Sequence, residues 1–169
     1  FVKVFDPKPL AGQISYGLEA ENKYEKIKAL IEARVLFEVG NVELAIKRAQ
    51  PSDIAELEEI LAKMEEHYHK TGDEHFGLDL SFHSKLVMMT RNPVIVRFSA
   101  ILYEIFAINS SYERDRAEDT KSIIESHRMI LDAVRVSDVA RAKSLMREHI
   151  INSGERRLLG LASVAVKNQ

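Results

Sequence analysis

An aspartate and a histidine lie four residues apart in the segment "LDLSFHSKL" (residues 78–86), among apolar side chains. Residues at positions i and i+4 of an α-helix share one face, so Asp79 and His83 point the same way. Leu80 and Leu86 indicate that this face belongs to the apolar side of the helix. Because an unpaired inward carboxylate costs several kcal/mol, we expect Asp79 to have a partner inside the protein.

Two other histidines interrupt apolar stripes in the same way. His127 lies at helical spacing from Ile124 and Leu131, and His149 completes a stripe that includes Met146. Three predicted helices therefore each direct one histidine inward. A single inward histidine is most often a hydrogen-bonded core residue, and this alternative stays open for each of them alone.

Taken together, the inward polar residues predict a metal site. A core cannot easily satisfy three imidazoles and a carboxylate by hydrogen bonds alone, whereas one divalent ion binds all four. The donor set suits a divalent transition metal; we expect zinc, with nickel, iron, manganese or cobalt as alternatives. We call this set the Asp–His cluster, and its members are Asp79, His83, His127 and His149.

Arg34 is a further polar residue on or beside an apolar stripe, the one that contains Leu30 and Ile31. Two interpretations stay open. In the first, the guanidinium pairs with a nearby glutamate, or the side chain extends along the apolar surface to reach water. In the second, it binds a ligand carboxylate, since guanidinium and carboxylate groups match each other through two parallel hydrogen bonds.

Helices must position these residues, and the sequence predicts helices almost throughout. Glycine (7) and proline (4) are few, and apolar residues recur at helical spacing. Pro51 and the pair Asn92-Pro93 mark helix starts, whereas Gly40-Asn41 is expected to break a helix. The predicted fold class is all-α, an antiparallel bundle of about six to eight helices. The expected helices span residues 10–20, 23–39, 42–49, 51–71, 74–90, 93–112, 121–136 and 139–161.

Composition excludes several classes of protein. The net charge of −2 and the pI of about 6.3 provide no basic face for nucleic acid. The absence of cysteine excludes disulfides and thiol chemistry. No apolar run is long enough to span a membrane and no signal peptide is visible, so a cytoplasmic protein without a membrane partner is expected. The chain starts at Phe1, without a methionine, which suggests a fragment of a longer protein.

Three segments, in order, resemble one known family. "YEKIKALIEARVLFEVGNVELAIKRAQPSDIAELEEIL" is similar to the opening helices of the FCD effector domain of FadR-subfamily GntR-type bacterial transcription regulators. "DLSFHSKLVMMTRNPVI" resembles the D-x-x-F-H-x-x-L segment of that family and the asparagine that follows it. "SHRMILDAVRVSDVARAKSLMREHI" resembles its H-x-x-I-L-x-A-I and D-x-x-x-A-x-x-x-M-x-x-H-I segment. The resemblance covers about residues 9–155.

The resemblance implies a bundle around a central cavity for ligand and metal. The metal residues of the family match the Asp–His cluster, which implies the metal-binding branch. The effector is then expected to be a small organic acid, sugar acid or amino acid that completes the coordination of the metal. Arg34 matches a family arginine and is expected to grip the effector carboxylate. Candidates for the cavity wall, although aromatic residues at such spacing usually belong to a core, are Tyr103, Phe106, Asn109 and Ser110.

The same resemblance implies a domain organisation. Residues 1–8 correspond to the end of a wing and an interdomain linker, residues 9–160 to the FCD-type effector-binding domain, and residues 161–169 to a C-terminal tail. The winged-helix DNA-binding domain is expected to precede this chain and to be absent from it, so DNA would be bound only through that domain. Because members of the family usually dimerise, a homodimer is expected.

An enzyme is the main alternative function, as a metal-dependent hydrolase whose metal is held by one aspartate and three histidines. A metal with an open coordination position activates water for hydrolysis. Helical metal-dependent phosphohydrolases, however, carry a His-Asp dipeptide, which this sequence lacks. Glu125 is close to His127 in sequence, but two residues along a helix directs it elsewhere. A sensor and not an enzyme is therefore expected, and a purely structural metal in an interaction domain is a third interpretation.

Overall fold

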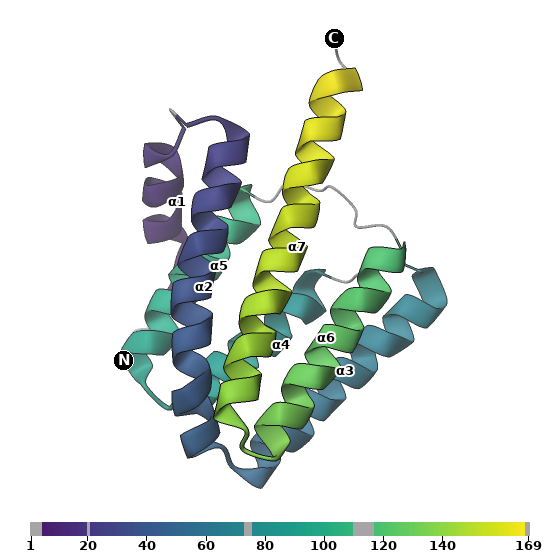
Figure 1. Cartoon of the computed structure of the whole chain (residues 1–169). Coiled ribbons are helices and arrows are strands. Elements are labelled where there is room, and N and C mark those ends of the chain that lie inside the picture. Colours follow the sequence, from purple (N-terminus) through teal and green to yellow (C-terminus); the bar gives the residue numbers. More distant parts are fainter. Residues whose placement is uncertain (1–4, 20, 73–75, 110–116, 168–169) are drawn as a thin grey trace.

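The described part of the chain is helical in all its regular structure. The computed structural model describes residues 5–19, 21–72, 76–109 and 117–167. Within these ranges seven helices pack as a bundle and no strand occurs (Figure 1), so the predicted all-α class is confirmed. The expected remnant of a wing at the start of the chain lies outside the described residues. No helix in the same ranges combines the length and the apolarity that crossing a membrane requires.

The helices carry the labels of Figure 1. In chain order they are α1 (Lys8–Gly17), α2 (Lys23–Arg48), α3 (Pro51–Thr71), α4 (Phe76–Met89), α5 (Pro93–Asn109), α6 (Ala117–Arg135) and α7 (Val139–Lys167). The starts of α5 and α7 follow the predicted caps. The side-chain oxygen of Asn92 accepts a hydrogen bond from the N–H of Val94 at 3.0 Å, and Asp138 Oδ1 accepts one from the N–H of Arg141 at 3.0 Å. These bonds satisfy N–H groups that have no partner in the first turn of a helix.

The predicted break at Gly40-Asn41 is wrong, because α2 continues through both residues to Arg48. A glycine inside a helix costs about 1 kcal/mol relative to alanine. Burial of Val42 and Ala45 in the main core outweighs that cost. Smaller differences occur elsewhere, since α1 begins at residue 8, α6 at residue 117, and α7 continues to residue 167.

The longest helix, α7, runs through the middle of the bundle. It packs along α2 on one side and along α6 on the other (Figure 1). At Gly154 the contact with α2 is tight, because an added Cβ would lie 2.5 Å from Ile31 Cδ1 and 2.7 Å from Ile31 Cγ1. Glycine at this position therefore allows the two long helices to lie against each other.

Apolar side chains form two clusters within the bundle. The larger cluster joins α2, α3, α4, α6 and α7, and includes Phe82, Ile130 and Met146. The smaller one joins α1, α2 and α5 through Ala11 and Phe106. The helices of the larger cluster are the ones that bring the inward polar residues together.

A buried carboxylate ties the start of α3 to the end of α4. Asp53 Oδ2 accepts hydrogen bonds from the backbone N–H of Gln50 and from Arg91, each at 2.7 Å. Asp53 Oδ1 accepts one from Lys85 Nζ at 3.0 Å. Burial opposes ionisation of Asp53, but these three donors lower the pKa of the carboxyl to about 2.

Candidate metal centre

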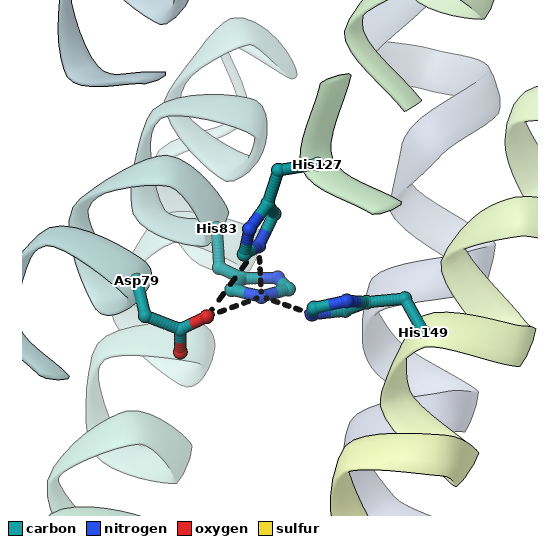
Figure 2. A group of neighbouring side chains, drawn as sticks. All are labelled: Asp79, His83, His127 and His149. Atoms are coloured by element: carbon teal, nitrogen blue, oxygen red, sulfur yellow. Dashed lines mark hydrogen bonds and ion pairs between the residues drawn. The ribbon is translucent and has the colours of Figure 1, made fainter. Parts of the chain in front are cut away.

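Three helices bring the Asp–His cluster together in the interior. Asp79 and His83 project from α4, His127 from α6 and His149 from α7, and their side chains converge (Figure 2). All four residues are buried; His127 has no exposed surface. The convergence of these particular residues, which the resemblance implied, is therefore present in the structure.

The ligand atoms of the cluster face one another at short distances. His83 Nε2 is central: it lies 3.1 Å from His149 Nε2, 3.3 Å from His127 Nε2 and 3.7 Å from Asp79 Oδ1. His127 Nε2 lies 3.4 Å from the same Asp79 oxygen. One ligand atom from each residue falls within a group whose members are all within 4.8 Å of one another.

These separations fit donors that share one ion. With metal–ligand bonds of about 2.1 Å, two ligands lie about 3.0 Å apart at a right angle and about 3.4 Å apart at a tetrahedral angle. The four short distances around His83 and His127 range from 3.1 to 3.7 Å. Three nitrogen donors and one oxygen donor also match the preference of borderline divalent metals. The four short distances and the donor types therefore suit a divalent transition metal, and the widest separation of up to 4.8 Å would shorten when one ion binds all four residues.

A serine fixes the proton of His149. His149 Nδ1 lies 2.7 Å from Ser126 Oγ, and Ser126 donates its own proton to the carbonyl oxygen of Ile123 at 2.7 Å. Because the serine hydroxyl has a single proton, His149 Nδ1 must be the donor in the first of these bonds. The Nε2 atom of His149 is then left with a lone pair that faces the cluster.

A glutamate that the sequence analysis did not single out contacts the far side of His83. Glu38 Oε2 lies 2.5 Å from His83 Nδ1, at ion-pair distance although not in the alignment of a linear hydrogen bond. Metal-bound histidines usually donate their second N–H to a carboxylate or a carbonyl in this position. When His83 carries its proton on Nδ1, the lone pair of its Nε2 faces the lone pair of His149 Nε2. These two lone pairs repel each other unless a further proton or a metal ion lies between the nitrogens.

Burial and nearby charges give the three histidines of the cluster different pKa values. Burial lowers the pKa of His127 to about 3 and holds that of His149 well below its usual value. Burial alone would also lower the pKa of His83, but Glu38 and Asp79 raise it to about 9. In the metal-free protein His83 therefore carries the proton that a metal ion would replace.

Arg34 lies beside the cluster and has a partner of its own. Its Nε donates a hydrogen bond of 2.6 Å to Glu38 Oε1, and both side chains are buried. The Arg34 guanidinium also lies over the ring of Phe106, with Cζ 4.7 Å from the ring centre. Burial opposes ionisation of Glu38, but Arg34 and His83 lower its pKa to about 2. The nearby glutamate expected under the first interpretation of Arg34 is thus Glu38.

The other candidate ligand residues occupy different places. Tyr103 lies on the wall of a small cavity of about 10 Å³ that Glu38, Asn41 and His83 also line. Asn109 uses its amide to join α5 to α1, donating to Ser15 Oγ at 3.1 Å and to the carbonyl oxygen of residue 105 at 2.8 Å. Ser110 lies outside the described residues. The structure therefore places Tyr103 next to the cluster and Asn109 at the α1–α5 contact.

Comparison with known families decides the classification. The model of the FCD domain family matches residues 29–152, which include the whole Asp–His cluster. The chain belongs to the FCD domain family. The fold, with seven helices among the described residues, is the fold expected of such a domain.

This FCD domain is related to two regulators of Bacillus subtilis. The HTH-type transcriptional regulator LutR is 23% identical over 157 residues, which cover 90% of this chain and 70% of LutR. The uncharacterized HTH-type transcriptional regulator YcbG is 27% identical over 127 residues, which cover 75% of this chain and 52% of YcbG. Because these relatives are transcription regulators and not enzymes, the prediction of a regulatory domain rather than a hydrolase is confirmed.

Solved structures share the fold of this FCD domain. E. coli McbR/YncC matches with a TM-score of 0.66 at 20% identity, over 75% of this chain and 64% of that one. Streptococcus agalactiae GntR matches with a TM-score of 0.64 at 26% identity, over 81% of this chain and 61% of that one. The FCD domain spans less than two thirds of either solved chain.

Two residues that contact the histidines of the cluster were not predicted from the sequence. Glu38 stands one helical turn after Arg34 on the same face of α2, so its i,i+4 spacing was a usable signal. Ser126 is adjacent to His127 in sequence but contacts His149 on another helix. Nothing in the local pattern around Ser126 indicates that partner.

Proposed function

We propose that this FCD domain is the effector-sensing part of a FadR-subfamily GntR-type transcription regulator. We also propose that the Asp–His cluster holds one divalent transition metal ion, with zinc as the first candidate. The observation that carries the proposal is the convergence of three imidazole nitrogens and one carboxylate oxygen in a buried site. Buried groups of this kind are costly without a common partner. A bound metal would supply Lewis acidity and open coordination positions for an oxygen ligand.

The proposed effector is a small organic acid, sugar acid or amino acid. Arg34 supports this proposal because it places a permanent positive charge in the interior, where a carboxylate is its natural counter-ion. Glu38 fills that role in this structure. Tyr103 is proposed to contribute a hydroxyl from the neighbouring wall, and Asn109 to contact the effector at the end of α5.

The proposed output is a change in DNA binding by a winged-helix domain that precedes the linker in a homodimeric, cytoplasmic regulator. An effector shifts such an equilibrium only if it binds two arrangements of the protein with different affinities. The hydrogen bond between Asn109 and Ser15 supports a route from α5 to α1, the helix that follows the proposed linker.

A thermal-shift screen tests the proposed function. Zinc-loaded and chelator-treated samples of the domain are melted with a panel of hydroxy-, keto- and sugar acids and with the matching uncharged amides. We expect at least one acid to raise the Tm of the zinc-loaded sample, without being consumed, and to have no effect on the chelated sample. Equal stabilisation of both samples, or turnover of the compound, would contradict the proposal. Binding to the full-length protein without any change in operator affinity would contradict the proposed output.

A further inference from the structure

Glu38 lies behind the Asp–His cluster, between His83 and Arg34. We propose that Glu38 is the positioning residue of the metal site: it holds the ring of His83 in the orientation and the protonation pattern that direct Nε2 toward the metal. This inference rests on the proposed metal site and adds a residue of α2 to a site built from α4, α6 and α7.

Each carboxylate oxygen of Glu38 has its own cationic or proton-bearing neighbour. Oε1 accepts from Arg34 Nε at 2.6 Å, and Oε2 lies 2.5 Å from His83 Nδ1. Glu38 is only 3% exposed, and the His83 side chain has no exposed surface. A carboxylate at this depth is retained because both of its oxygens have such partners.

The shared contact gives Glu38 a chemical role toward His83. An imidazole binds a metal through a nitrogen that carries no proton, so His83 must keep its single proton on Nδ1 when Nε2 is the ligand. A carboxylate accepts hydrogen bonds and donates none, so it stabilises that arrangement and no other. The same contact opposes rotation of the ring away from His127 and His149.

An amide in place of the carboxylate cannot satisfy both neighbours. If the oxygen of a glutamine at this position accepts from Arg34 Nε, its NH2 group faces His83 Nδ1 and favours the proton on Nε2, which blocks the metal. If the glutamine turns the other way, its NH2 group faces the N–H of Arg34 and two donors meet. Glu38→Gln therefore perturbs the site while changing neither the length nor the shape of the side chain.

The test compares zinc binding by Glu38→Gln with binding by a matched control. Glu43→Gln lies on the same helix, where Glu43 is partly exposed and pairs with Lys47 and Lys143. Zinc affinity is measured by competition with a chromophoric chelator. We expect Glu38→Gln to bind zinc on the order of 10- to 100-fold more weakly than the wild type, and Glu43→Gln to bind it like the wild type. Wild-type affinity in Glu38→Gln would overturn the inference.

A second measurement applies to the wild-type protein and does not depend on the variant folding. In the zinc-loaded domain, NMR of the histidine side chains should show the proton of His83 on Nδ1 and none on Nε2, with slow exchange with solvent, as expected for a buried N–H next to a carboxylate. Its absence would overturn the inference. If the wild type binds no zinc at all, the proposed metal site fails instead, so the two failures are distinguishable. The absorption spectra of cobalt(II)-loaded wild type and Glu38→Gln provide a further comparison. A displaced His83 ring changes the ligand field and therefore the spectrum, whereas a general loss of stability does not.

Discussion

His83 Nε2 faces His149 Nε2 at 3.1 Å, although the two residues are 66 positions apart in the chain and lie on α4 and α7. Ser126 occupies the Nδ1 side of His149, and Glu38 occupies the Nδ1 side of His83. Two bare nitrogens cannot remain at this distance without a cation between them. The pair therefore requires either a shared proton or a metal ion, and this requirement leads to the first prediction.

Removing either histidine should remove the metal. His83→Ala and His149→Ala each delete one of the four donors. We expect elemental analysis to find one equivalent of zinc in the wild type and none in either variant. The rise in stability on adding zinc should disappear as well, a rise of about 2.7 kcal/mol when free zinc exceeds its Kd a hundredfold. Thermal melts with and without chelator measure this difference.

The control for that experiment is His69→Ala, since His69 is exposed near the end of α3. This variant should keep both its zinc and its zinc-dependent stability. One equivalent of zinc in His83→Ala, or loss of zinc from His69→Ala, would show that the metal binds elsewhere.

A single methyl group should disturb the contact between α2 and α7. At Gly154 an added Cβ would lie within 3.1 Å of three side-chain atoms of Ile31. Isoleucine has one strongly preferred χ1 rotamer in a helix, so its side chain cannot turn aside without strain. We expect Gly154→Ala to lower the free energy of unfolding by about 1–2 kcal/mol, as measured by urea denaturation.

Gly40→Ala provides the opposite outcome in the same protein. Gly40 lies in the middle of α2, and an added Cβ there meets nothing within 4 Å. Alanine is the better helix former, so this variant should be more stable by up to about 1 kcal/mol. If both substitutions changed the free energy of unfolding equally, the close α2–α7 contact at Gly154 would not determine the effect of an added methyl group.

The cavity behind His83 should hold one water molecule. Its volume of about 10 Å³ is close to the minimum for a water. The Tyr103 hydroxyl and the Asn41 amide nitrogen are buried there without a hydrogen-bond partner among the described residues. A water that accepts from these donors and donates to Glu38 satisfies all three groups. We therefore expect Tyr103→Phe to lower the free energy of unfolding by about 1 kcal/mol; a gain in stability would show that the cavity is dry.

Asp53 should make stability depend on pH in the acidic range. Its pKa is about 2 in the folded protein against an ordinary value of 3.8. A depressed pKa stabilises the folded state above the unfolded-state value, and this contribution is lost as the pH falls from about 4 to about 2. We expect Asp53→Asn to cost about 2 kcal/mol at neutral pH and progressively less across that window. Urea denaturation at a series of pH values would contradict this if the difference stayed constant.

The sequence predicted the Asp–His cluster because polar residues within apolar stripes are conspicuous. His127 and His149 each break a regular helical pattern, and the family resemblance then joined them to the pair on α4. The pattern could not assign the second nitrogen of each ring. That nitrogen is set by contacts between helices, such as the one from Ser126 on α6 to His149 on α7.

The continuity of α2 shows a second limit of local sequence patterns. Gly40-Asn41 has the composition of a helix end, and the local cost of a glycine is about 1 kcal/mol. Val39 and Val42, on either side of the pair, are both buried against the rest of the bundle. The resulting tertiary packing decides the conformation, and a pattern read along one segment does not contain it.

The Asp–His cluster joins positions that are 44 and 66 residues beyond His83 in a chain that has no cysteine. A bound ion would close these long loops as a disulfide does, and would restrict the unfolded chain in the same way. Separation of α4, α6 and α7 would then require coordination bonds to break first. In the presence of a chelator, the rate at which the ion dissociates would set the lifetime of the folded domain. The domain would therefore resist unfolding kinetically only where metal is available to it.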